Sequence, residues 1–262
     1  MSTSRRTFLG ATAGLAGWAL SGGPVRGATA SGTPDGRPGP GTIRALALDA
    51  FVVFDPRPID ALAEQLVPDR GKDLIDRWRT RQFEYTWLRT VAGQHLDFAA
   101  VTEGALRWAS RSLQLSLDPG TQRRLLEAHA RLGPWPDASA ALASLRARGL
   151  RLALLSNFTP AMLAGCVRAS GLDGVFDRVL STEAVRTFKP DPRAYQLGVD
   201  ALRLRREEIA FAAHAGWDAA GARWFGYRTL WVNRLGLPPE ELSAQPDVIH
   251  SSLGELARAL VG

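Results

Sequence analysis

Four short apolar runs in the chain have the length and composition of buried β-strands. They cover residues 43–48, 150–155, 208–213 and 227–232, and apolar residues recur at helical spacing between the later runs. Strands that alternate with helices are typical of a doubly wound, Rossmann-like parallel sheet. The pattern therefore predicts an α/β fold.

A long helical interval separates the first predicted strand from the second. Leu, Trp and Phe recur there at helical spacing in about four segments, and the interval ends at Pro134 and Pro136. No run within it has the pattern of a strand. We therefore expect a core formed by residues 43–56 and 134–262, with a helical cap subdomain of residues 57–133 inserted after the first strand.

The start of the chain has the features of an export signal. Arg5 and Arg6 precede a moderately apolar stretch and the small-residue pattern at 28–30, so that residues 1–30 resemble a twin-arginine signal peptide. A membrane anchor is a weaker interpretation, because the apolar stretch contains glycines and is shorter than the ~20 residues that span a bilayer. We expect export to the periplasm, signal cleavage, a flexible lead-in over residues 31–42, and no stable membrane span in the mature protein.

Composition and charge narrow the function only slightly. The 262-residue chain is 45% hydrophobic and 22% charged, which is typical of a globular protein. The formal net charge is +6, but the basic residues are scattered through amphipathic segments, which argues against a nucleic-acid partner. Cys166 is the only cysteine, so no intramolecular disulfide forms and no Cys–His cluster has the spacing of a structural zinc site.

Polar residues that follow the predicted strands are the candidates for chemistry. Asp49 follows the first strand, and Ser156 and Asn157 follow the second. Lys189 precedes a helix that begins with proline, and Asp218 follows the strand after it. Each has an ordinary alternative interpretation as a turn residue, a helix cap or a surface lysine. Because ligands of parallel sheets bind at the carboxyl ends of the strands, the ordered series predicts one shared site.

This series resembles the motifs of the haloacid dehalogenase superfamily, whose fold also carries an inserted helical cap. The resemblance covers essentially the whole mature chain. The segments 81–89, 156–160 and 216–218 resemble the type II (S)-2-haloacid dehalogenases in particular. The phosphatases of the superfamily have a second acid two residues after the nucleophile, where this chain has Phe51. Magnesium also prefers several hard oxygen ligands, and only Asp218 is evident near the fourth strand.

The resemblance implies a hydrolase of carbon–halogen bonds, (S)-2-haloacid dehalogenase, EC 3.8.1.2, that works without a metal or a cofactor. Asp49 would attack C2 of a short 2-haloalkanoic acid and form an ester, which water would hydrolyse to the 2-hydroxyalkanoic acid. Lys189 would keep Asp49 ionised, and Asp218 would position Lys189 and help to activate the water. Arg89 and the Asn157 amide would meet the departing halide, and Ser156 would hold the substrate carboxylate.

The same resemblance implies a wider set of substrate-binding residues. They are Ala50, Phe51, Arg89, Trp108, Ser156, Asn157, Tyr195 and Trp217.

The chain also departs from the pattern of these dehalogenases. Family members commonly have a Gly-Thr pair in the nucleophile loop, whereas this loop reaches Val53 and is one residue shorter. Ala213 and Ala215 stand where Ser and Asn are common, and His214 between them is interpreted as structural. Two alternatives therefore stay open: a phosphatase-type hydrolase of the superfamily, and a catalytically weak periplasmic carboxylate-binding protein. The amphipathic cap helices also permit a homodimer.

Overall fold

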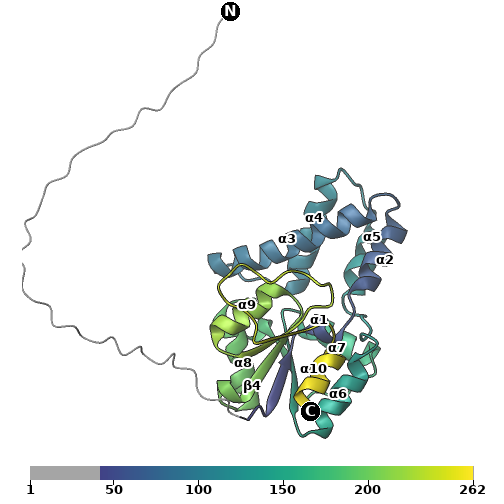
Figure 1. The fold of residues 1–262 in the computed structure, drawn as a ribbon. Helices are drawn as coiled ribbons and strands as arrows, with labels where there is room; N and C mark the ends of the chain where they lie inside the picture. The colour runs from purple at the N-terminus through teal and green to yellow at the C-terminus, as the bar shows by residue number, and fades with distance from the viewer. Residues whose placement is uncertain (1–41, 262) are drawn as a thin grey trace, which may run out of the picture. The chain divides into compact units, whose positions relative to one another are not determined.

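A computed structural model of the protein describes residues 42–261. The predicted export signal and the lead-in up to residue 41 lie outside this range. The described chain folds around a six-stranded parallel sheet in the order β3-β2-β1-β4-β5-β6 (Figure 1). The strands are β1 (Ala45–Leu48), β2 (Arg151–Ser156), β3 (Arg178–Ser181), β4 (Ile209–Ala213), β5 (Arg228–Val232) and β6 (Val248–His250).

Helices cover both faces of this sheet. The helices of the core domain are α1 (Ala50–Val53), α6 (Ala138–Ala147), α7 (Pro160–Ala169), α8 (Pro192–Leu202), α9 (Gly216–Phe225) and α10 (Leu253–Val261), with the short 3-10 helices η1 (Thr182–Val185) and η2 (Arg206–Glu208). In β1, Leu46 and Leu48 pack into one apolar core with α6, α7 and α10, whereas Ala45 and Ala47 pack into a second core with α8 and α9. A strand buried on both faces has no polar alternation, which explains the continuous apolar runs of the sequence.

The predicted α/β fold is confirmed, and four of its strands coincide with the four apolar runs. The two strands that the pattern did not predict, β3 and β6, lie at the two edges of the sheet. Their residues are largely exposed or only half-buried. An edge strand packs fewer apolar neighbours, and for that reason it carries a weaker hydrophobic signal.

The inserted helical cap is confirmed as well. It consists of α2 (Arg57–Leu66), α3 (Gly71–Ala92), α4 (Phe98–Ser112) and α5 (Pro119–Ala128). The start of α4 is fixed by Asp97, whose carboxylate accepts a hydrogen bond from the backbone of Ala100 at 2.7 Å. Helices α3 and α4 pack together, and Gln82 Nε2 donates to Thr102 Oγ1 between them at 2.6 Å. No helix among residues 42–261 is long and apolar enough to cross a membrane.

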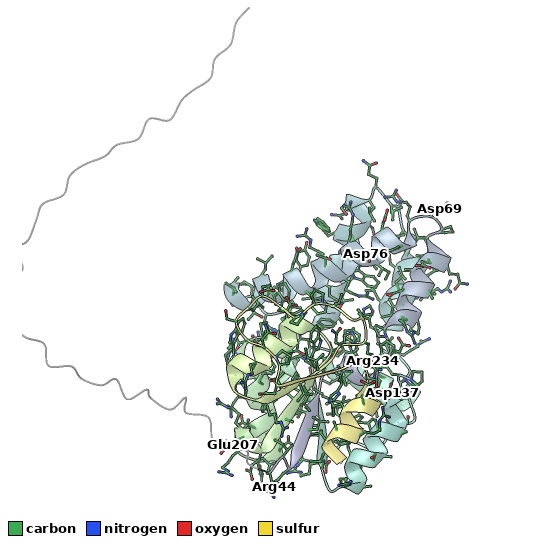
Figure 2. The ribbon with its side chains drawn as sticks, viewed as in Figure 1. Arg44, Asp69, Asp76, Asp137, Glu207 and Arg234 are labelled. Atoms are coloured by element: carbon green, nitrogen blue, oxygen red, sulfur yellow. The ribbon has the colours of Figure 1, made fainter. Side chains whose placement is uncertain are left out.

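The junction between cap and core is held by polar contacts at the end of the sheet. Trp135 N donates to Val53 O at 2.9 Å, joining the two chain segments that lead into and out of the cap. Figure 2 shows Arg234 beside Asp137, and their side chains form an ion pair at 3.0 Å. Arg234 also donates to Val52 O at 3.1 Å. The short helix α1 is therefore held by Arg234 and by the backbone of Trp135.

Candidate active site

Three charged side chains meet at the carboxyl ends of β1 and β4. Lys189 Nζ lies 2.7 Å from Asp49 Oδ1 and 2.7 Å from Asp218 Oδ2. Lys189 and Asp218 are each 1% exposed and Asp49 is 8% exposed, so water screens these charges poorly. A buried ammonium compensates two carboxylates only while this geometry is kept.

Local structure fixes each member of this cluster. Asp49 is the N-cap of α1, and its Oδ2 accepts a hydrogen bond from Phe51 N at 2.9 Å. Lys189 N donates to Asn157 Oδ1 at 2.9 Å, which ties the lysine loop to the end of β2. The first turns of α9 carry Asp218, and Gly221 lets this helix approach the lysine loop, because an added Cβ would lie 2.5 Å from Pro190 Cβ.

The electrostatics of the cluster raise the pKa of both Lys189 and Asp218. Burial by itself would lower the pKa of Lys189, but the charges of Asp218 and Asp49 outweigh it and raise the pKa. Burial raises the pKa of Asp218 to about 6, although Lys189 and a hydrogen bond from Tyr195 act in the opposite direction. Tyr195 donates to Asp218 Oδ1 at 2.7 Å, and burial raises the pKa of this phenol well above its usual value. The phenol therefore stays a hydrogen-bond donor.

A cavity of about 230 Å³ opens beside this cluster, between core and cap. Its volume is below the ~300–1,000 Å³ of sites for drug-sized ligands, so it suits a small molecule. Phe83 of α3 and Trp217 of α9 close one side, with ring centroids 5.3 Å apart. Its polar lining residues are Asp49, Arg57, Asp60, Arg79, Ser156, Asn157, Lys189, His214 and Asp218.

Most of the residues expected at the site lie at this cavity. Asp49, Phe51, Ser156, Asn157, Lys189, Trp217 and Asp218 line it. Tyr195 lies behind Asp218 and reaches the cavity only through that carboxylate. Ala50 is fully buried in the apolar core, so its contribution is limited to its backbone.

Arg89 and Trp108 are not brought to the cavity. Arg89 Nη1 donates to Gln94 O at 2.9 Å, near the end of α3. The ring of Trp108 lies 3.6 Å below the guanidinium of Arg81 on the cap. The arginine of α3 that does line the cavity is Arg79, ten residues earlier. Ten residues correspond to about 15 Å along a helix axis, so only one of these two arginines can face the site.

Sequence reasoning also missed Arg57 and Asp60 and interpreted His214 as structural, whereas all three line the same cavity. Arg79 Nη2 lies 2.6 Å from Asp60 Oδ1, so the cap presents its arginine already paired with an acid. A signal for Arg79 exists in the sequence. It follows the buried Trp78 and stands four residues before Phe83, so a helical projection of α3 places it beside the buried face.

The described part of the chain has no cluster of three or more His, Cys, Asp or Glu side chains arranged to hold a metal ion.

A family model described as haloacid dehalogenase-like hydrolase matches residues 50–226. The chain belongs to this family. The haloacetate dehalogenase H-2 of Moraxella sp. (strain B) is 39% identical over 206 residues, which are 78% of this chain and 92% of the relative. An (S)-2-haloacid dehalogenase of Pseudomonas sp. (strain YL) is 40% identical over 212 residues, which are 80% and 91% of the two chains.

A solved structure of a family member agrees with the fold as well. The L-2-haloacid dehalogenase of Xanthobacter autotrophicus with chloropropionic acid covalently bound superposes with a TM-score of 0.77 and 33% identity. The match covers 84% of this chain and 99% of that structure. The resemblance to the haloacid dehalogenase superfamily that the motifs indicated is therefore confirmed, and the chain is similar to the L-2-haloacid dehalogenases over most of its length.

Proposed function

We infer that the protein is an (S)-2-haloacid dehalogenase, which hydrolyses small 2-haloalkanoic acids to 2-hydroxyalkanoic acids and halide. One observation carries this function: the Asp49 carboxylate opens on a small cavity while Lys189 holds it at 2.7 Å. Phe51 occupies the position where the phosphatases of the family have their second acid, and the related dehalogenases share 39% and 40% of their residues with this chain over most of its length.

The first chemical step is a displacement by Asp49. One carboxylate oxygen is held by Lys189 and the other by Phe51 N, so the group is oriented before substrate arrives. Attack on C2 forms an ester and expels halide, with inversion at that carbon. An ammonium beside the nucleophile compensates the negative charge that is buried at the end of β1.

The substrate carboxylate needs donors at the other side of the cavity. Asn157 Oδ1 is already occupied by Lys189 N and Thr182 Oγ1, at 2.9 and 3.2 Å. The amide nitrogen of Asn157 is therefore the part of this side chain that is left for a ligand. Ser156, which lies 2% exposed at the end of β2, supplies a hydroxyl at the same edge.

Arg79 takes the role that the sequence suggested for Arg89, the stabilisation of the departing halide. It lines the cavity from the cap, whereas Arg89 is turned to a backbone carbonyl. Fixed donors aimed at a leaving group lower the barrier because they meet charge as it develops. The side chains of Arg79 and Asp60 are 45% and 33% exposed, so their ion pair is weak enough to adjust when an anion enters.

Halide release from racemic 2-chloropropionate in EDTA tests this function. We expect release with the wild-type protein, none with Asp49→Asn, and depletion of the (S) enantiomer alone. Asp69→Asn is the matched control, because this acid lies in a cap loop far from the cavity (Figure 2). Magnesium-dependent release of phosphate from an ester would instead indicate a phosphatase. Binding of 2-chloropropionate without halide release would indicate a carboxylate-binding protein.

We also propose export by the twin-arginine route. The support is the motif around Arg5 and Arg6 with the small residues at 28–30. Cell fractionation tests the proposal: an Arg5→Lys, Arg6→Lys double variant is expected to stay in the cytoplasm while the unaltered protein reaches the periplasm. Equal distribution of both forms would contradict it.

A homodimer is a further proposal about the same chain. Leu88 and Val91 on α3 are 61% and 89% exposed, so the cap presents apolar side chains to solvent. Light scattering on the wild type and on a Leu88→Glu, Val91→Glu variant tests this: a dimer that becomes a monomer supports the proposal, and a monomeric wild type refutes it.

A further inference from the structure

His214 stands in the wall of the cavity without a polar partner. It follows β4 and packs beside Phe51 and Trp135, with ring centroids 6.0 and 6.5 Å away. Its Nδ1 is buried, and no side-chain hydrogen bond joins it to another residue of the range 42–261. A buried polar atom without a partner destabilises the folded protein, and His214 combines such an atom with a place in the wall of the cavity.

Other acceptors beside the charged cluster already accept hydrogen bonds. Each oxygen of Asp218 accepts a hydrogen bond, one from Lys189 and one from Tyr195. Lysine and arginine side chains offer only donors. Ser156 Oγ accepts from Phe158 N at 3.2 Å. His214 differs from them because its Nδ1 has no hydrogen-bond partner among the described residues, and it lines the same cavity as Asp49.

The residues on both sides of this histidine add no competing group. Ala213 and Ala215 end their side chains in methyl groups, and Ala215 itself lines the cavity. Neither of these two side chains offers a hydroxyl or an amide to a water molecule in the cavity. The histidine side chain is the single polar group that the segment between β4 and α9 turns toward the cavity.

We propose that His214 holds the water that hydrolyses the Asp49 ester, by accepting a hydrogen bond from it. This inference rests on the proposed dehalogenase function. The oxygen of the water forms a bond to Cγ of Asp49, and the bond from Cγ to the ester oxygen breaks, so that this former Oδ atom leaves with C2 as the hydroxyl oxygen of the product. One proton of the water ends on the hydroxyl of the product, and the other leaves when the regenerated Asp49 carboxyl ionises.

The protonation state of the ring agrees with this role. Burial lowers the pKa of His214 to about 4, although the charge of Asp49 acts in the opposite direction. The imidazole is therefore neutral near neutral pH and keeps one nitrogen lone pair. A neutral ring also leaves the nucleophilic charge of Asp49 intact during the displacement, which a cationic ring would reduce.

Separation of the two half-reactions tests the proposal with 2-chloropropionate as the probe. His214→Phe keeps a flat ring between Phe51 and Trp135 but has no lone pair, and His214→Gln keeps an acceptor. For His214→Phe we expect a rapid burst of about one halide per active site, followed by steady-state turnover at least ~10-fold slower than wild type. Intact mass spectrometry is expected to show the added mass of the ester, and peptide fragmentation is expected to locate it on Asp49. His214→Gln is expected to recover part of the turnover, and His250→Gln at the far edge of the sheet is the matched control.

The outcomes separate this inference from the function on which it rests. If His214→Phe turns over within twofold of wild type, or slows the burst and the steady state equally, the water-holding role is wrong and the dehalogenase function stands. If the wild-type protein releases no halide from 2-chloropropionate, the proposed function fails, and the role of His214 fails with it.

Discussion

Replacing Lys189 by Met removes the only positive charge between two buried carboxylates. Asp49 and Asp218 lose a partner that stands 2.7 Å from each of them. Removing one member of a buried ion pair costs about 3–5 kcal/mol, because the remaining charge is left uncompensated. The variant can lower this cost if the two carboxylates together take up one proton.

The size of the effect follows from that cost. One pKa unit corresponds to about 1.4 kcal/mol, so 3–5 kcal/mol corresponds to about 2–4 units. The pKa of Asp218, already raised to about 6 in the wild type, would then reach about 8 or more for the pair. At neutral pH most molecules of the variant would carry the extra proton. Loss of the charge-assisted hydrogen bond to the nucleophile adds about 1.5–3 kcal/mol to the barrier.

Single-turnover halide release measured against pH is the assay for Lys189→Met. We expect a loss of about 100-fold or more at neutral pH, with the residual rate increasing as pH rises through about 8. The free energy of unfolding of the variant is expected to increase as pH falls through the same range, because a raised carboxyl pKa makes the folded state bind the proton more tightly than the unfolded chain.

Lys72→Met is the matched control, because Lys72 is the only other lysine and its side chain is 77% exposed. A Lys189→Met variant within tenfold of wild type, or with a rate independent of pH, would refute the electrostatic reasoning.

Two further predictions concern the cap arginines and the tyrosine behind the site. Arg79→Ala is expected to slow the displacement step about 100-fold, while Arg89→Ala stays within about threefold of wild type. Single-turnover halide release measures both rates. Equal losses in the two variants would contradict the placement of Arg79. Tyr195→Phe removes a hydrogen bond that lowers the pKa of Asp218, so the acid limb of the kcat profile is expected to move from about 6 toward higher pH. A profile that does not move, with Tyr85→Phe as control, would exclude Asp218 from the titration.

The core of the protein was predictable because its signals are local. Buried parallel strands are continuously apolar, and a polar residue that ends such a strand must lie at the ligand-binding edge. Asp49 and Asp218 follow β1 and β4 in this way, and the two strands are neighbours in the sheet, so their side chains converge on Lys189. The edge strand β3 was not predicted, because its half-exposed residues give no apolar run.

The cap was predictable as an element but not in its orientation. Helical spacing identifies α3, yet the residues that face the cavity depend on how the helix is rotated and how far it extends over the sheet. Arg79 and Arg89 lie on the same helix in similar sequence surroundings, and only the packing of α3 against α4 and the core distinguishes them. Arg89 was predicted because it stands in segment 81–89, which resembles the family. In the structure its side chain contacts the backbone of the cap instead of the cavity.

The same distinction explains His214. A lone histidine after a strand is more often structural, and sequence alone gives no reason to prefer a role in catalysis. Its significance comes from three features that no motif encodes. Both oxygens of Asp218 already accept a hydrogen bond, the neighbouring side chains are methyl groups, and Nδ1 of the ring has no hydrogen-bond partner in the part of the chain that the structure describes. The polar residues at the carboxyl ends of the strands therefore define which reaction the fold supports. The hydrogen-bonding groups around them that have no partner define where a water molecule binds for that reaction. Substrate range and turnover are consequently expected to respond more to changes at Arg79, Asp60 and His214 than to changes in the apolar cores.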